Sequence, residues 1–174
     1  DHTVAAPARQ HPNFVFRREA LADRVLKGVA GTLESHLQST GAANTRQGTV
    51  MLKADVEGAE FTALLATSSE VIARFDQICI ELHWLCRPRR GADFRTKALA
   101  LERLNENFVL MHAHGNSYGD IADVAGVALP DVLEALYVNR RLLGPDWVET
   151  SRRGIPDPEL DANNCEFVPD IALA

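Results

Sequence analysis

The spacing of apolar residues along this chain of 174 residues changes between a period of two and a helical period. The clearest strand is Gln77–Trp84, where apolar and polar residues alternate and therefore point to opposite faces. One face carries Ile78, Ile80 and Leu82, and the other carries Cys79, Glu81 and His83. The segment predicts a strand with one face toward a core and titratable side chains on the other.

Four other segments have the length and apolar character of strands, with turn-forming residues around them. They are Phe14–Leu21, Thr49–Ala54, Val109–His114 and Val132–Asn139.

Apolar residues at helical spacing predict three helices. One begins near Thr32, one covers Gly58–Phe75 with a break near Thr67, and one covers Ala92–Phe108. The glycines of Gly115–Pro130 predict a loop between the last two strands.

The order of these elements predicts the fold class. Strands that alternate with helices indicate an α/β domain with a mostly parallel sheet. The last two strands have no helical pattern between them, so we expect that pair to be antiparallel. We assign residues 1–143 to this domain and residues 144–174, which contain several prolines, to an irregular tail.

Composition and charge narrow the function classes. The net charge of −6 argues against a general nucleic-acid binder, which needs clustered basic residues, and Arg87–Arg90 is the one dense basic run. No apolar stretch reaches the roughly 18–20 residues of a membrane span, and no secretory signal is present. Three cysteines without metal-like spacing indicate free thiols and a reducing compartment, so we expect a cytoplasmic protein. The oligomeric state does not follow from the sequence.

Polar side chains gather where the predicted strands end. Ligands of such sheets bind beyond the carboxyl ends of the strands, so these side chains are expected to converge on one crevice. An antiparallel last strand would bring its beginning, with Glu134, to the same edge. The converging residues are Asp55, Glu57, Glu81, His83, His112, His114, Asn116 and Glu134.

Structural roles explain some of these residues equally well. A carboxylate in a first helical turn complements the helix dipole, which would account for Glu60 and in part for Glu57. His112 has the pattern of a hydrogen-bonded core histidine. A buried Glu81 needs a partner, for which Lys53 is one candidate.

Carboxylates with histidines fit two chemistries, which are general acid–base catalysis and divalent metal binding by Asp and His. The spacing matches no HExxH-type motif, no GxSxG turn and no glycine-rich phosphate loop. The sequence therefore gives only a weak signal for a metal, and we assign no residue to a metal site.

The stretch MLKADVEGAEFTALL (Met51–Leu65) resembles the "LKiDvEGaE…L" signature of the FkbM-type methyltransferases, a Rossmann-like family that depends on S-adenosylmethionine. Further pieces resemble the family in the same order, up to about Leu143. They are DHTV…HPNFVF at the start, ICIELHW at residues 78–84, HAHGNSYGD at 112–120 and LPDVLEALYVNR at 129–140. The resemblance implies a seven-stranded sheet whose last two strands form an antiparallel pair.

The resemblance also implies a cofactor side of the site. Asp1 would stand near the end of the second strand and accept the ribose hydroxyls, while Ala22 and Asp23 would lie near the adenine. Lys53 would tune Asp55 electrostatically. The family's first strand and glycine-rich loop would precede Asp1, so the expectation is a methyltransferase domain that is incomplete at its N-terminus.

The resemblance further implies transfer of a methyl group from S-adenosylmethionine to a hydroxyl of a small, carbohydrate-like substrate. Asp55 is expected nearest the methyl group, with His83 and His114 as alternative bases. Glu57, Asn116 and Glu134 are expected to contact the substrate.

Two other interpretations remain open. One is a non-catalytic binding module that keeps the fold. The other is a metal-dependent hydrolase that uses Asp55, Glu57, His83 and His114.

Overall fold

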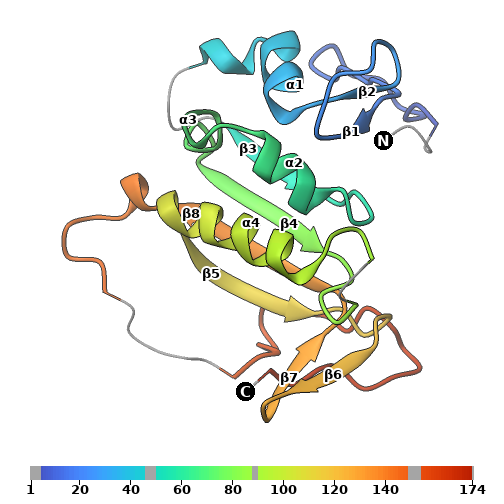
Figure 1. Ribbon diagram of the computed structural model, residues 1–174, viewed down its shortest axis with the longest axis vertical. Coiled ribbons are helices and arrows are strands. Elements are labelled where there is room, and N and C mark those ends of the chain that lie inside the picture. Colours follow the sequence, from blue (N-terminus) through green and yellow to red (C-terminus); the bar gives the residue numbers. More distant parts are fainter. Residues whose placement is uncertain (1–4, 46–49, 88–89, 149–153, 174) are drawn as a thin grey trace.

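Four strands form the central sheet of the computed structural model, which describes residues 5–45, 50–87, 90–148 and 154–173 (Figure 1). In their order across the sheet they are β3 (Met51–Ala54), β4 (Gln77–Leu82), β8 (Leu133–Asn139) and β5 (Phe108–Gly115). β3 and β4 pair in parallel, and β8 pairs antiparallel with both β4 and β5. The predicted α/β class and the antiparallel pair of the last two strands are confirmed. The prediction of a mostly parallel sheet is wrong for this sheet, because β8 makes two antiparallel pairings and only β3 and β4 pair in parallel.

Helices cover one face of this sheet. They are α2 (Glu60–Ala66), α3 (Ser69–Ile72) and α4 (Phe94–Asn107). The core lies between these helices and the sheet, because the apolar face of β4 and the inner faces of the helices are buried together. The predicted break near Thr67 is present, where Ser68 begins α3 by accepting a hydrogen bond from the Val71 N–H.

The N-terminal segment departs from the prediction. Only β1 (Ala20–Leu21) of the expected strand Phe14–Leu21 is a strand, and it pairs in parallel with β2 (Ala30–Gly31). Phe14 is 69% exposed, and its N–H donates to the His11 carbonyl in a turn. The alternation of apolar residues was misleading, because a strand also needs a neighbour for its backbone groups. The segment then continues into α1 (Leu33–Thr40) and the 3-10 turn η1 (Ala42–Asn44).

The prediction of a loop over Gly115–Pro130 is wrong for most of this segment. Its second half forms a hairpin of β6 (Ile121–Val124) and β7 (Val127–Pro130). Ala125 and Gly126 make the turn, with φ angles of 55° and 85°. Two-residue hairpin turns require such left-handed angles, for which asparagine–glycine is the usual signal and alanine is not.

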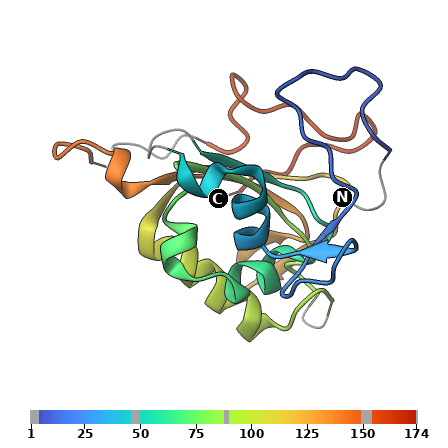
Figure 2. The same cartoon turned by 90° about the horizontal axis from the view of Figure 1, so that it is seen from above.

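The chain after the 3-10 turn η2 (Arg140–Leu142) has no helix or longer strand among its described residues. Residues 154–173 lie on the side of the sheet opposite to the helices α2, α3 and α4 (Figure 2). Ile171 forms an isolated bridge to Gly115 at the end of β5 and is buried. The C-terminal segment therefore packs against the edge of the sheet where the predicted site residues lie.

Candidate functional site

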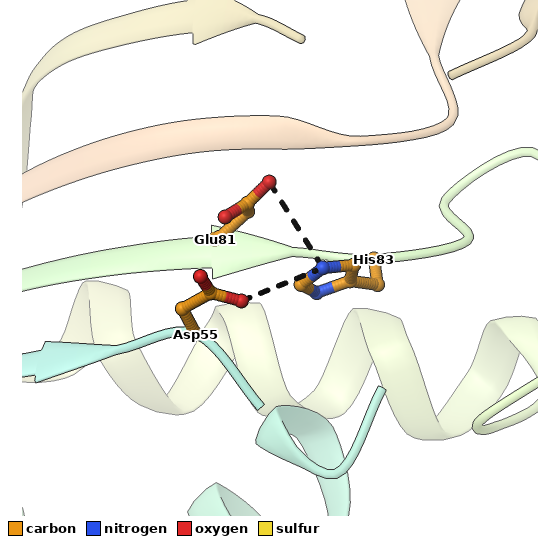
Figure 3. Close-up of side chains that lie close together, drawn as sticks. All are labelled: Asp55, Glu81 and His83. Atoms are coloured by element: carbon orange, nitrogen blue, oxygen red, sulfur yellow. Dashed lines mark ion pairs between the residues drawn. The ribbon is translucent and has the colours of Figure 1, made fainter. Parts of the chain in front are cut away.

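Carboxylates and one imidazole come together where β3 and β4 end. Asp55 directly follows β3, Glu81 lies in β4, and His83 directly follows β4 (Figure 3). Nε2 of His83 is 3.8 Å from Oδ1 of Asp55 and 3.9 Å from Oε1 of Glu81. It is also 3.6 Å from Oε2 of Glu57. The parallel pairing of the two strands makes this possible, because it places both carboxyl ends at one edge.

His83 is buried, and Glu60 fixes its position. The backbone N–H of His83 donates to Oε1 of Glu60 at 2.6 Å, and the ring Nδ1 lies 3.5 Å from the same oxygen. Burial lowers the pKa of His83, but Glu60, Glu81 and Glu57 outweigh this effect, so the pKa is raised above its usual value. The surrounding carboxylates therefore favour the protonated ring.

Glu60 is a first-turn carboxylate, as predicted, and it also links two strand ends. Its Oε2 accepts the N–H of Gly58 at 2.8 Å, while its Oε1 accepts the N–H of His83. Its side chain is buried, so these bonds replace water at both oxygens. Glu60 therefore holds the turn after β3 against the end of β4.

Glu81 is held from the far side of the site by Asn116. Nδ2 of Asn116 donates to Oε1 of Glu81 at 3.0 Å. Burial and the negative charge of Asp55 raise the pKa of Glu81 above its usual value. Asn116 thus takes the role that the sequence offered to Lys53, which is exposed.

The backbone beside the cluster has left-handed conformations at three positions. Glu57, Gly58 and Trp84 have φ angles of 52°, 97° and 57°. Such angles are uncommon for residues other than glycine, and they concentrate at functional sites. The left-handed conformations of Glu57 and Trp84, at the ends of β3 and β4, were not predicted from the sequence.

A second group forms on β5 and β8, outside the cluster around His83. Glu134 pairs across the sheet with Glu81 on one side and His114 on the other. Nε2 of His114 lies 3.0 Å from Oδ1 of Asp170, and its Nδ1 lies 3.7 Å from Oε2 of Glu134. The ring is buried, and its ion pairs are with these two carboxylates. Asn164 donates to Oε1 of Glu134 at 2.8 Å.

The tail residues of this second group were missed by the sequence analysis. Asp170 and Asn164 follow no periodic pattern, so no local signal could have connected them to β5 and β8. The same holds for Asp161, whose Oδ1 lies 2.6 Å from Nε2 of His112. His112 thus has a carboxylate partner, as expected of a structural histidine.

A cavity of about 550 Å³ opens beside the cluster, between the N-terminal segment and the end of β3. Lys53, Val56 and Glu57 line one side of it, and Ala20 and Leu21 line another. Ala22 and Asp23 directly follow β1, and Asp23 is exposed. Asp1 lies outside the described residues.

Three side chains of the cluster have the arrangement of cation ligands. One ligand atom from each of Asp55, Glu81 and His83 can be chosen so that all lie within 4.8 Å of one another. The sequence predicted no metal site, because it contains none of the usual metal motifs. The structure brings these three ligand types together from two separate strands.

No protein-family model, curated protein or solved structure matches this chain in the comparisons with known proteins. Among the described residues, no helix combines the length and the apolar character that crossing a bilayer requires.

Proposed function

We propose that this chain belongs to an S-adenosylmethionine-dependent methyltransferase that acts on a hydroxyl group, as its resemblance to the FkbM-type enzymes implies. The position of Glu57 carries the proposal. Its carboxylate lies 3.6 Å from His83, and the same residue lines the cavity of about 550 Å³. A space for a ligand and a group of acid–base side chains therefore meet at the carboxyl ends of parallel strands, where such sheets bind ligands.

The size and lining of the cavity support binding of the adenosine part of the cofactor there. Its volume of about 550 Å³ lies within the range of small-molecule sites, roughly 300–1,000 Å³. Leu21, Leu33 and Leu52 give it an apolar wall suited to a flat ring, and Lys53 adds a hydrogen-bond donor. When bound, the cofactor would supply an electrophilic methyl group.

The remaining work falls to side chains of the cluster. Asp55 is 50% exposed, so a substrate hydroxyl can reach it, and its carboxylate would orient that hydroxyl and accept its proton. His83, whose Nε2 lies 3.8 Å from Oδ1 of Asp55, is a second group that can hold a proton. Asn116 would act through Glu81, which it fixes in place. His114 faces Asp170 and Glu134, so the proposal does not use it as a base.

Methyl transfer from labelled S-adenosylmethionine to a panel of sugars and other hydroxyl compounds tests the proposal. Asp55→Asn keeps the size of the side chain and is expected to lower transfer about 10²–10⁴-fold, the usual contribution of a general base. Glu102→Gln, on the exposed face of α4, is the matched control and should leave transfer unchanged. Transfer by Asp55→Asn at the rate of the unchanged protein would refute the role of Asp55.

Calorimetry with the cofactor separates this proposal from a binding module. The unchanged protein is expected to bind S-adenosylmethionine with release of heat, and Lys53→Ala is expected to bind it more weakly. No binding at millimolar cofactor would favour the non-catalytic module.

A metal-dependent hydrolase is the second candidate, and the mutual proximity of Asp55, Glu81 and His83 favours it. Such an enzyme would cleave ester substrates in the presence of Mn²⁺ and without S-adenosylmethionine. Cleavage under those conditions, together with the absence of methyl transfer, would establish this candidate in place of the first.

A further inference from the structure

The spacing of three side chains at the ends of β3 and β4 suits a bound cation. The ligand atoms of Asp55, Glu81 and His83 lie within 4.8 Å of one another. Two ligands of one divalent ion, at bond lengths of about 2.1–2.4 Å, can be at most about 4.2–4.8 Å apart. All three atoms can therefore reach a common centre with small changes of side-chain rotation.

His83 gives an independent indication. The residue is only 5% exposed, and its Nδ1 faces Oε1 of Glu60 at 3.5 Å, so Nε2 is the ring nitrogen left for the cluster. Its Nε2 points at the cluster, yet the oxygens of Asp55, Glu57 and Glu81 remain 3.6–3.9 Å away. An imidazolium that only neutralised these carboxylates would draw one of them to about 2.7–2.9 Å. None of these three oxygens lies within hydrogen-bond distance of Nε2, so the lone pair of a neutral ring is available to a cation.

Charge in the cluster points the same way. Among the ion pairs of the described residues, His83 is the one basic side chain that reaches Asp55, Glu57 or Glu81. Glu60 needs no further partner, because two backbone N–H groups satisfy it. Asn116 is neutral and steadies Glu81 without compensating its charge. Carboxylates gathered at this density repel one another unless a positive charge joins them.

We propose that Asp55, Glu81 and His83 bind one divalent cation of the Mn²⁺ type. Carboxylate oxygens suit Mg²⁺ and Mn²⁺, while imidazole suits the transition metals, so a mixed set of this kind favours Mn²⁺. Three protein ligands leave positions open for water or substrate. Asp55 is half-exposed and lies on the open side, so one of its oxygens can bind the cation while the other faces a substrate.

A role for this cation in binding the methyl acceptor rests on the proposed function. A hydroxyl oxygen of the acceptor would occupy an open position, where the cation lowers the pKa of the hydroxyl and fixes its orientation. Two neighbouring hydroxyls, as in a sugar or a catechol, could occupy two positions at once. The site thus selects acceptors with adjacent oxygens.

A titration of the full chain with Mn²⁺ alone tests the site without cofactor or acceptor. The electron paramagnetic resonance signal of free Mn²⁺ measures how much of the ion is bound. One ion per chain is expected to bind, and Asp55→Asn should weaken binding by at least about 10-fold. Glu57→Gln removes one charge from the same neighbourhood, at a side chain 76% exposed, and should weaken binding less than about 3-fold. Circular dichroism and thermal unfolding of each variant without metal check that it folds.

Three results would overturn the site. They are no binding at millimolar Mn²⁺, equal weakening by Asp55→Asn and Glu57→Gln, or an unfolding temperature that Mn²⁺ raises equally in the unchanged protein and Asp55→Asn. The site and the proposed function can fail separately. Mn²⁺ binding without methyl transfer keeps the site and refutes the function, whereas transfer without any Mn²⁺ binding refutes the site alone. Transfer unaffected by a chelator refutes the use of the cation in the reaction.

Discussion

The indole ring of Trp84 lies directly against Gly58, at the joint between the end of β4 and the turn that follows β3. A Cβ on Gly58 would lie 2.0 Å from Cζ3 of Trp84, and Gly58 also has a left-handed φ of 97°. Both residues adjoin the cluster, because Gly58 follows Glu57 and Trp84 follows His83. The contact leaves no room for a side chain at position 58.

Gly58→Ala is therefore expected to destabilise the protein. Overpacking costs about 1–3 kcal/mol, and the left-handed backbone adds to it. Gly126→Ala is the matched control, because Gly126 has a similar φ of 85° but open space around its Cα. Urea unfolding should show the larger loss for Gly58→Ala. Equal losses for the two variants would show that the Trp84 contact does not matter.

Glu60→Gln tests whether one carboxylate holds the two strand ends together. The amide has a single acceptor oxygen, so either the Gly58 N–H or the His83 N–H is expected to face an NH₂ group. Loss of a charged, buried hydrogen bond should lower the free energy of unfolding by about 1.5–3 kcal/mol. Glu102→Gln is the control for loss of a surface charge. Equal stability of the two variants would contradict the structural role of Glu60.

Glu57→Gly tests separately the backbone strain at Glu57 and the role of its side chain in methyl transfer. Glycine accepts the φ of 52° without the cost of about 1–2 kcal/mol that a left-handed side-chain residue bears, so stability should rise modestly after the loss of chain entropy. Ala125 has a φ of 55° in the β6–β7 turn, so Ala125→Gly should raise stability by a similar amount. Under the proposed function, only Glu57→Gly lowers methyl transfer. Thermal unfolding and the transfer assay measure both effects, and equal transfer by the two variants would show that Glu57 has no role in it.

The attachment of the tail to β5 is expected to depend on pH through His114. Burial lowers the pKa of His114, but Asp170, Asp161 and Glu134 outweigh it and raise the pKa above its usual value of 6.5. A raised pKa in the folded state means that the interaction stabilises the protein fully below pH 6.5 and is lost as the pH rises through the folded-state pKa.

Thermal unfolding as a function of pH measures the stability that this attachment contributes. The unfolding temperature of the unchanged protein should fall as the pH rises above 6.5, and that of Asp170→Asn should vary much less over the same range. A parallel decline in both proteins would exclude His114 as the cause.

Arg103 joins α4 to the end of α2. Its guanidinium donates to the carbonyl oxygens of Leu65 and Thr67 at 2.7 and 2.8 Å, which the helix itself leaves without partners. Arg103→Met keeps much of the apolar stem and should cost about 1–3 kcal/mol. Arg95→Met, at an exposed position of the same helix, is the comparison. Chemical denaturation should show a loss for Arg103→Met alone.

Local pattern was sufficient for most of the fold. The alternation in Gln77–Trp84 and the helical spacing in Ala92–Phe108 gave β4 and α4 to within about two residues at each end, because both elements have one apolar face. The same reasoning failed at Phe14–Leu21, where apolar alternation has no neighbouring strand along most of its length. It also missed the β6–β7 hairpin, whose turn lacks the usual residues.

The candidate site divides in the same way. The sequence by itself determined that Asp55, Glu81 and His83 stand at strand ends, because the period of a strand fixes which residues share a face. Only the tertiary structure decided that they meet around a buried imidazole, that Asn116 holds Glu81, and that Asp170 in the tail reaches His114. These contacts join segments far apart in the chain. Their partners are chosen by the packing of the sheet and the tail, which no local pattern of residues encodes.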